Sequence, residues 1–314
     1  MLLNPKKVEV DIFVIYSLSV CIIIVVSILA LVKKHVAPPR VQPQKETMSV
    51  ISQTILFNKH AFDHVKIEGR AYVVYDILSK ETIASKNETT KLPLASITKV
   101  MMAISATLHK EKNEKVTVSP KSIEDGYDLG LKDKQIWELS ELLKYTLVFS
   151  SNDGAEIVAD SFGGKDIFVT QMNADAKNLG LNILFTDPAG RDIGGKFGGL
   201  GTVTEVAKLF SVARKNIPEI MDATTKKRET VIVNGGKMRG IPNTNQAIES
   251  LSGAEASKTG YTDMAGGNLG VIVDISIGRP VVIVVLGSTK EGRFKDMSIL
   301  YKTLRESILH TDIQ

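Results

Sequence analysis

The hydrophobic positions of the chain fall into one continuous apolar stretch near the amino end and a longer region of alternating and helical patterns. Residues 12–32 carry no charged side chain, and their length matches an α-helix that crosses a bilayer. This apolar core is longer than that of a cleaved signal peptide, and no small-residue cleavage pattern separates it from Lys33. We therefore expect a retained membrane anchor. The polar, proline-bearing residues 33–53 are typical of a linker between an anchor and a folded domain.

The patterns after residue 53 predict one folded domain, residues 54–311, in which strands flank a helical region. Alternation around a short polar turn predicts strands at residues 71–76 and 81–85, and strand-like runs separated by glycine or proline predict others at residues 230–233, 237–238, 254–257, 269–277 and 281–286. Helical spacing predicts a helix that begins at Ser96 and further helices over residues 137–147, around 157–158, and over 203–210 and 294–309. This order predicts an α+β fold whose terminal segments share one sheet, with a helical subdomain at about residues 116–225.

Composition and charge exclude several classes of function. The 314 residues include 43% hydrophobic and 24% charged side chains, as in an ordinary globular protein. The net charge of +4 is small and no basic stripe with interleaved aromatic residues occurs, so we expect no nucleic-acid binding. The one cysteine, Cys21, lies inside the apolar stretch. The domain therefore has no thiol for catalysis, disulfides or cysteine-zinc sites, and we expect no metal and no cofactor.

The first candidate for chemistry is the pair Ser96 and Lys99, which are spaced as Ser-x-x-Lys at the start of a predicted helix. This separation places both side chains on one helix face. A serine hydroxyl becomes a nucleophile when a base removes its proton, and a lysine can be that base when its pKa is lowered. Chance alone gives roughly one such match in a chain of this length, so the spacing is weak evidence by itself.

Two further motifs follow in order, Ser150-Ser151-Asn152 and Lys258-Thr259-Gly260. Together with Ser-x-x-Lys they form the motif set of serine acyltransferases that react with penicillin. Each motif has a structural alternative: the serines could cap the following helix, and Lys258 could be a solvated charge on an edge strand. Lys258 would also bring a second positive charge into the cleft. We expect that Lys99 then gives up its proton early and that Lys258 keeps its own.

Longer stretches around these motifs carry a resemblance to a known family. They are residues 93–102, 141–153, 185–190, 243–245 and 258–263. Over residues 54–309 the chain resembles the D-alanyl-D-alanine carboxypeptidases of the low-molecular-weight penicillin-binding protein type, the S11 serine peptidases. The resemblance implies a DD-peptidase/β-lactamase-like fold, with a five-stranded antiparallel sheet flanked by helices and an all-helical subdomain across the cleft.

By this resemblance, four side chains take part in acylation. Ser96 is the nucleophile that becomes acylated, and Lys99 is its general base. Ser150 relays protons between the nucleophile and the leaving group, and Asn152 binds the substrate backbone through its amide. The resemblance thus assigns a separate role to each polar residue of the first two motifs.

The resemblance places the other site residues on the opposite wall of the cleft. Lys258 and Thr259 line a strand edge along which a peptide can lie by β-augmentation. Gly260 permits close approach to that backbone. The backbone N–H of Tyr261 forms an oxyanion hole together with that of the nucleophile. Arg293 matches a family arginine that receives the terminal carboxylate of the substrate.

The implied activity is removal of the terminal D-alanine from peptidoglycan stem peptides, with β-lactams as covalent inhibitors. A DD-endopeptidase that cuts crosslinks would use the same groups. A β-lactamase and a catalytically idle β-lactam-sensing or wall-binding domain are further alternatives. Because the substrate lies outside the cytoplasmic membrane, we expect residues 1–11 in the cytoplasm and the domain outside, although the flanking lysines do not set this orientation. At the cleft rim, Gly154 and Arg191 stand where the family usually has alanine and leucine.

Overall fold

The structure of the protein, a computed structural model, describes residues 56–123, 131–233 and 236–309 together with position 24. The predicted tail, anchor and linker lie outside the described residues, apart from Ile24. No helix in the described part of the chain is long and apolar enough to cross a membrane. The chain divides into residues 1–54 and residues 55–314, and the fold below is that of the second unit.

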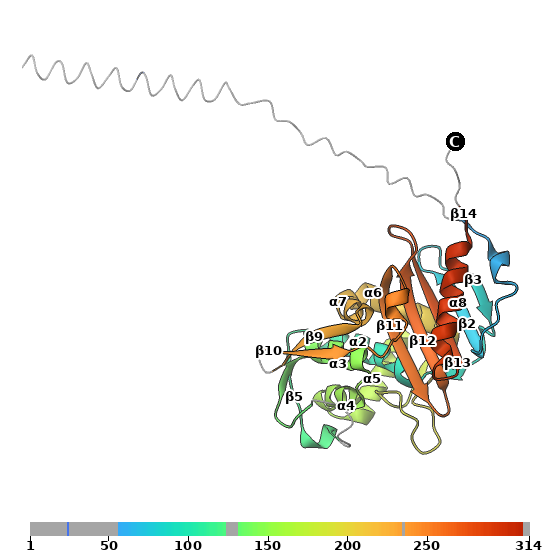
Figure 1. The fold of residues 1–314 in the computed structure, drawn as a ribbon. Helices are drawn as coiled ribbons and strands as arrows, with labels where there is room; N and C mark the ends of the chain where they lie inside the picture. Colours follow the sequence, from blue (N-terminus) through green and yellow to red (C-terminus); the bar gives the residue numbers. More distant parts are fainter. Residues whose placement is uncertain (1–23, 25–55, 124–130, 234–235, 310–314) are drawn as a thin grey trace, which may run out of the picture. The chain divides into compact units, whose positions relative to one another are not determined.

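The centre of the domain is a five-stranded antiparallel sheet in the order β11-β12-β13-β2-β3 (Figure 1). Its strands are β11 (Ala254–Thr262), β12 (Gly266–Asp274), β13 (Pro280–Ser288), β2 (Ala71–Asp76) and β3 (Glu81–Lys86). Val284 of β13 pairs with Val73 of β2, so strands from the two ends of the domain lie side by side. This confirms the predicted α+β fold with a five-stranded antiparallel sheet.

Both faces of the sheet are covered, and β13 shows how its sequence allows this. The run of apolar residues from Val281 to Leu286 is fully buried, because alternate side chains point to opposite faces. Residues 281, 283 and 285 pack with Leu300 and Leu304 of α8 (Gly292–Glu306). Residues 282, 284 and 286 belong to the larger core shared with the helical region.

The helical region contributes six α-helices to the described chain. They are α2 (Thr98–His109), α3 (Leu139–Phe149), α4 (Asn152–Ser161), α5 (Lys165–Asn178), α6 (Val203–Asn216) and α7 (Pro218–Asp222). The expected helices after Leu139, around 157–158 and over 203–210 are present. Helix α5 was not expected, because it buries little apolar surface: its buried residues are Phe168, Met172, Asp175 and Ala176.

Several boundaries differ from the sequence-based expectation. Trp137 lies in β6 (Ile136–Glu138), which pairs with β5 (Lys115–Thr117), and not in the helix that follows. The closing helix ends at Glu306, because Ile308 and Leu309 form β14 and pair with β1 (Leu56–Phe57). Both boundaries are set by backbone pairing between segments that are distant in the sequence. Such pairing cannot be seen in the local periodicity of hydrophobic residues.

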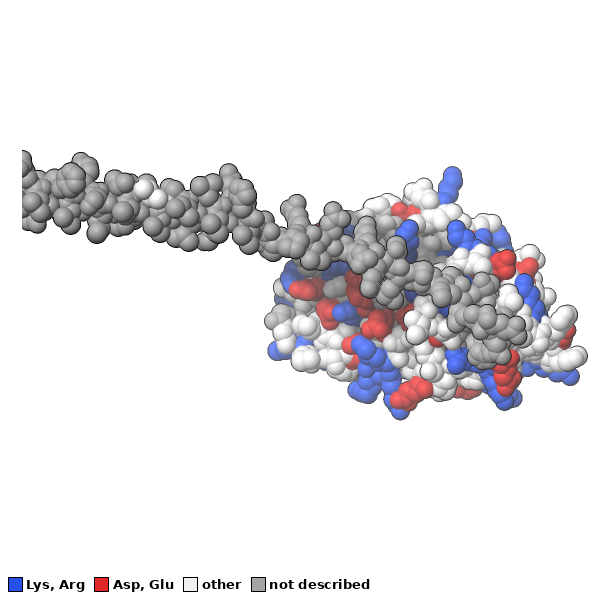
Figure 2. All heavy atoms as spheres, turned by 90° about the horizontal axis from the view of Figure 1, so that it is seen from above, with Lys and Arg blue, Asp and Glu red and all other residues white. Residues whose placement is uncertain are grey.

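Short elements complete the described domain. A small sheet consists of β4 (Leu92–Pro93), β8 (Gly199–Gly201) and β7 (Leu184–Phe185), and a hairpin consists of β9 (Arg228–Val233) and β10 (Lys237–Pro242). The 3-10 turns are η1 (Lys59–Phe62), η2 (Ala95–Ile97), η3 (Pro120–Ser122), η4 (Ala223–Thr225) and η5 (Ile248–Ser250). Acidic and basic side chains are interspersed over the face shown in Figure 2, as the small net charge leads one to expect.

Candidate active site

The predicted nucleophile lies on a tight turn and not inside a regular helix. Ser96 is the middle residue of η2, and α2 begins after it, at Thr98. Ala95 has a φ of 48°, in the left-handed region that costs a non-glycine residue about 1 kcal/mol. The buried side chain of Asn268 supports the turn, because its Nδ2 donates a 2.9 Å hydrogen bond to the carbonyl of Pro93. The serine itself is partly exposed to solvent.

Lys99 follows on the first turn of α2, and its side chain is fully buried. Its Nζ donates hydrogen bonds to Ser96 Oγ at 2.8 Å, to Asn152 Oδ1 at 2.8 Å and to the carbonyl of Ala189 at 2.7 Å. The three acceptors come from η2, from the start of α4 and from the loop after β7. An amine at hydrogen-bond distance from the serine hydroxyl meets the geometric condition for a general base.

The Ser150-Ser151-Asn152 motif both caps a helix and contributes to the cleft. Ser150 ends α3 in the left-handed conformation, with a φ of 64°. Ser151 is the N-cap of α4, and its Oγ accepts a 2.7 Å hydrogen bond from the backbone N–H of Gly154. The two flanking side chains, Ser150 and Asn152, instead contact the two buried lysines. The capping alternative therefore holds for the middle residue and leaves the other two available for the site.

Lys258 reaches the site from β11 and is 1% exposed. Its Nζ donates hydrogen bonds to Ser150 Oγ at 2.8 Å and to the carbonyl of Thr259 at 2.9 Å. Burial in the first place, and then the positive charges of Lys99 and Arg293, lower the pKa of Lys258 well below its usual value. The alternative of a solvated edge-strand charge is wrong, because η2, η4 and α7 pack against this strand.

The burial of Lys258 changes the expected division of charge between the two lysines. The sequence-based prediction kept Lys258 as the cation because a lysine on a strand edge can still meet the anionic substrate. Burial instead lowers the pKa of Lys258, which disfavours its charged form. The two amines form one coupled system. That Lys99 is the group that accepts the proton stays a prediction.

The edge strand β11 runs directly beside the nucleophile turn. A Cβ at Gly260 would lie 2.8 Å from the carbonyl oxygen of Leu94 and 3.2 Å from the backbone nitrogen of Ser96. The glycine thus permits close approach of the chain's own turn, which the sequence argument had not foreseen. This contact places the N–H of Ser96 next to the residue that precedes Tyr261, which is where an oxyanion hole built from these two N–H groups requires it.

Arg293 adds a third cation near this strand. It lies in the first turn of α8, is 7% exposed, and its Nη1 donates a 2.7 Å hydrogen bond to the carbonyl of Gly260. Burial lowers the pKa of its guanidinium from the usual value. The amines of Lys99 and Lys258 and the guanidinium of Arg293 therefore lie in one region, which suits an anionic group such as a carboxylate.

Two residues without a role in the sequence-based prediction contact the predicted site. The carbonyl of Ala189 accepts a hydrogen bond from Lys99, and the hydroxyl of Thr244 lies 2.7 Å from Thr259 Oγ1. Both lie inside stretches that carried the family resemblance. A backbone carbonyl has no residue-type signature, so spacing alone could not identify the first contact.

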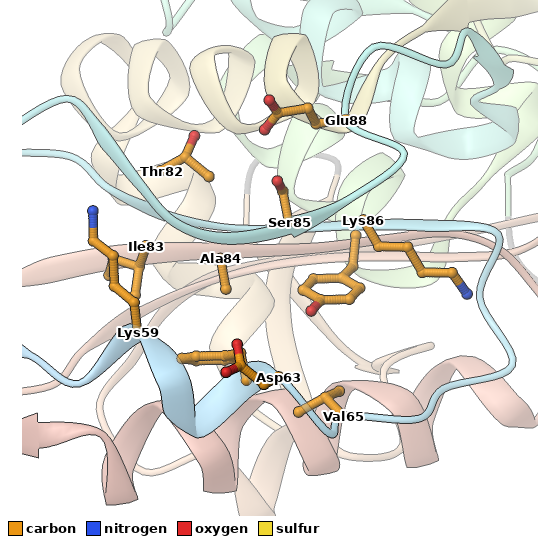
Figure 3. Close-up of a pocket in the computed structure, with 11 residues that line it drawn as sticks. Lys59, Asp63, Val65, Thr82, Ile83, Ala84, Ser85, Lys86 and Glu88 are labelled. Atoms are coloured by element: carbon orange, nitrogen blue, oxygen red, sulfur yellow. The ribbon is translucent and has the colours of Figure 1, made fainter.

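The described part of the chain also contains a cavity of about 580 Å³ between β3 and η1 (Figure 3). Ile83 and Ala84 line it together with the charged residues Lys59 and Asp63. Since β3 and β11 are opposite edges of the sheet, this cavity is separate from the serine-lysine cluster. Among the described residues, no group of three or more His, Cys, Asp or Glu side chains is placed to hold a metal ion.

The fold and the paired serines and lysines define a class, the serine enzymes that transfer acyl groups. Comparison with known proteins identifies the family: residues 58–290 match the peptidase family described as D-alanyl-D-alanine carboxypeptidase. The chain belongs to this family, which confirms the resemblance seen in the sequence.

Relatives of known name and structure agree with this membership. The D-alanyl-D-alanine carboxypeptidase DacB2 of Mycobacterium tuberculosis is 28% identical over 226 residues, which cover 71% of this chain and 77% of the relative. The D-alanyl-D-alanine endopeptidase of Escherichia coli is 28% identical, with 75% and 76% covered. The ampicillin-bound structure of penicillin-binding protein D2 from Listeria monocytogenes superposes with a TM-score of 0.68 at 28% identity, covering 76% of this chain and 98% of that protein.

Proposed function

We propose that this protein is a serine-type D-alanyl-D-alanine carboxypeptidase, which removes the terminal D-alanine of peptidoglycan stem peptides through an acyl-enzyme. The observation that carries the proposal is the pairing of two serines with two buried lysines. Lys99 Nζ lies 2.8 Å from Ser96 Oγ, and Lys258 Nζ lies 2.8 Å from Ser150 Oγ. One pair can activate a nucleophile while the other returns a proton to the leaving group.

In the proposed acylation step, Ser96 Oγ attacks the carbonyl carbon of the peptide bond between the two D-alanines. The hydroxyl proton passes to neutral Lys99, and the N–H groups of Ser96 and Tyr261 stabilise the negative charge on the carbonyl oxygen. The carbon–nitrogen bond then breaks. The departing amine takes a proton from Ser150, which Lys258 replaces. Water hydrolyses the resulting ester and regenerates the serine.

Substrate binding would use the wall formed by β11. An extended peptide can pair with this edge strand through its backbone, and Asn152 can bind the peptide from the other side of the cleft. Lys258, Thr259 and Arg293 would receive the terminal carboxylate. The guanidinium of Arg293 and the amine of Lys258 beside it support this assignment, because a carboxylate would find hydrogen-bond donors there.

A DD-endopeptidase is the second candidate, since the matched relatives in Escherichia coli, Pseudomonas aeruginosa and Haemophilus influenzae carry that name. The two activities differ in the group that leaves: free D-alanine or a crosslinked peptide. Incubation of the full chain with a D-Ala-D-Ala-terminated stem pentapeptide and, separately, with a crosslinked dimer tests this. The proposal expects D-alanine release to be the faster reaction, and faster cleavage of the dimer would contradict it.

We also propose that β-lactams react covalently with Ser96. The Listeria monocytogenes relative has been crystallised with ampicillin and with cefotaxime, at 28% and 27% identity to this chain. The cyclic amide of a β-lactam can be attacked by the same serine, and the carboxylate of the drug fits the same cationic wall. Labelling by a fluorescent penicillin that persists in Ser96→Ala would contradict the assignment.

For the amino-terminal part we propose a single membrane-spanning anchor at residues 12–32, a cytoplasmic tail at 1–11, a linker at 33–53 and an external catalytic domain at 54–311. The apolar, uncharged sequence and the external location of the substrate support this arrangement. A reporter fused after residue 314 should be active outside the cytoplasm. Activity confined to the cytoplasmic side would contradict the topology.

A further inference from the structure

A buried carboxylate fixes the loop that contacts Lys99. Asp187 is 2% exposed, and its Oδ1 accepts hydrogen bonds from the backbone N–H groups of Ala189 at 2.9 Å and Arg191 at 3.0 Å. Its Oδ2 accepts a 2.7 Å hydrogen bond from Lys165 at the start of α5. The loop is therefore wound around this side chain. As a result, the carbonyl of Ala189 is held where Lys99 Nζ can reach it.

Arg191 connects this loop to the helix on the other side of Lys99. Its Nη2 donates hydrogen bonds to Asp187 Oδ2 at 3.1 Å and to Glu156 Oε1. Glu156 lies on α4, one turn after Asn152, whose Oδ1 accepts a hydrogen bond from Lys99. The Arg191 guanidinium thus links the loop that carries the Ala189 carbonyl to helix α4, which carries Asn152. Both groups accept hydrogen bonds from Lys99.

Burial of the Arg191 side chain costs free energy, which the hydrogen bonds to Asp187 and Glu156 must offset. Its Nε is buried and has no hydrogen-bond partner among the described residues. The side chains of Arg191 and Glu156 are 27% and 17% exposed, so water screens their ion pair only in part. An apolar residue such as leucine would avoid the buried donor but could not join the two carboxylates.

We propose that Arg191 is a positioning residue for Lys99. Through Glu156 and Asp187 it fixes the spacing between Asn152 Oδ1 and the Ala189 carbonyl, and these two acceptors aim the lysine amine at Ser96 Oγ. The inference rests on the proposed acyl-enzyme function, because it concerns the rate of the same acylation step. Arg191 does not touch the reacting atoms and acts through its two carboxylate partners.

The test measures acylation of the full chain by a fluorescent penicillin and separates the binding constant K from the acylation rate constant k2. Arg191→Leu should lower k2 by about tenfold to a hundredfold with little change in K, because small misplacement of a catalytic group costs this much. Arg191→Lys should recover part of k2, since a lysine can still pair with one carboxylate. The double variant Arg191→Leu/Glu156→Leu should remain slow, because the link between loop and helix is still missing.

A matched control comes from a second partly buried arginine pair. Arg279 donates to Asp76 at the end of β2, with side-chain exposures of 17% and 2%. Arg279→Leu should lower Tm as much as Arg191→Leu does and leave k2 unchanged. An equal loss of k2 in both variants would show a general effect of stability and would overturn the proposal.

Two further results would overturn the inference while leaving the proposed function intact. One is a k2 in Arg191→Leu equal to that of the parent. The other is recovery of k2 in the double variant, which would show that an unpaired Glu156 charge, and not lost positioning, slows Arg191→Leu. A parent chain that is not acylated at all would instead contradict the proposed function, and the inference with it.

Discussion

Lys258 Nζ donates a 2.8 Å hydrogen bond to the hydroxyl of Ser150, although the two residues lie 108 positions apart in the sequence. The bond joins the edge strand β11 to the junction between α3 and α4. Together with the Ser96 and Lys99 pair it forms a cluster of two hydroxyls and two amines, in which Lys99 also contacts Asn152. Helix α2 supplies one lysine of this cluster and strand β11 supplies the other.

The first prediction separates the roles of the two lysines. Lys99→Arg should lower acylation by penicillin about a thousandfold or more, because arginine stays charged and cannot accept the serine proton. Lys258→Arg supplies a permanent positive charge for the carboxylate of the drug but no transferable proton, so it should retain only part of the rate. Stopped-flow acylation between pH 6 and 9 measures both variants. Near-parental acylation by Lys99→Arg would remove this lysine as the base.

The second prediction concerns stability. The folded chain holds Lys258 with a lowered pKa, so between that pKa and the unfolded value of about 10.4 the unfolded state binds more protons. Stability is therefore lost as pH falls through this range. Lys258→Met should raise Tm at pH 7 by about 2–4 °C, and this gain should shrink as pH rises towards 10.4.

Thermal unfolding of the parent and the Lys258→Met variant across pH 7 to 10.5 measures this difference. Acylation should be strongly reduced in the same variant, since the proton donor for Ser150 is gone. A Lys258→Met variant with a lower Tm than the parent at pH 7 would show that burial of the Lys258 amine does not destabilise the folded state.

The third prediction uses Arg293, whose positive charge contributes to the lowered pKa of Lys258. Arg293→Gln removes this charge, so the pKa of Lys258 should rise towards its usual value. The alkaline limb of the acylation pH profile, which reports loss of the proton from the donor Lys258, should then move to higher pH. The test of coupling is the position of this limb and not the overall rate, because loss of the contact between Arg293 and the substrate carboxylate lowers the rate as well. An unmoved limb would exclude coupling between the two cations.

The fourth prediction concerns Gly190, which has a φ of 81°. A Cβ at this position would lie 2.0 Å from the carbonyl oxygen of Ala95, beside the nucleophile. Gly190→Ala should lower the free energy of unfolding by at least about 2 kcal/mol, because the strained backbone and the clash add. Chemical denaturation measures the loss. Gly194→Ala is the matched control, because it also has positive φ, at 58°, but no atom within 4 Å of the added Cβ.

The sequence predicted those parts of the site that depend on residue type and spacing. Ser96, Lys99, Ser150 and Asn152 were found because hydroxyl, amine and amide groups occur at recognisable intervals. In the structure, hydrogen bonds join Lys99 to Ser96 and Asn152, and Lys258 to Ser150. The strands of the sheet were predicted from strand-like apolar runs such as residues 281–286, and the five-stranded antiparallel arrangement came from the family resemblance. These patterns are local, so they can be recognised in a single sequence.

The parts that were missed depend on contacts between distant segments. The full burial of Lys258 was not predicted, because an edge strand is open until other elements cover it, and the sequence around Lys258 does not show that η2, η4 and α7 do so. Trp137 was assigned to a helix because its pairing partner, Val116 of β5, lies outside the local window. The Ala189 contact to Lys99 uses a backbone carbonyl, which every residue has.

The most direct test of the account is the mass of the full chain after reaction with benzylpenicillin, followed by mapping of the modified peptide. The account predicts one adduct per chain, attached at Ser96, and no adduct in Ser96→Ala. An adduct on another residue, or equal labelling of the parent and the variant, would contradict the assignment of Ser96 as the acylated nucleophile.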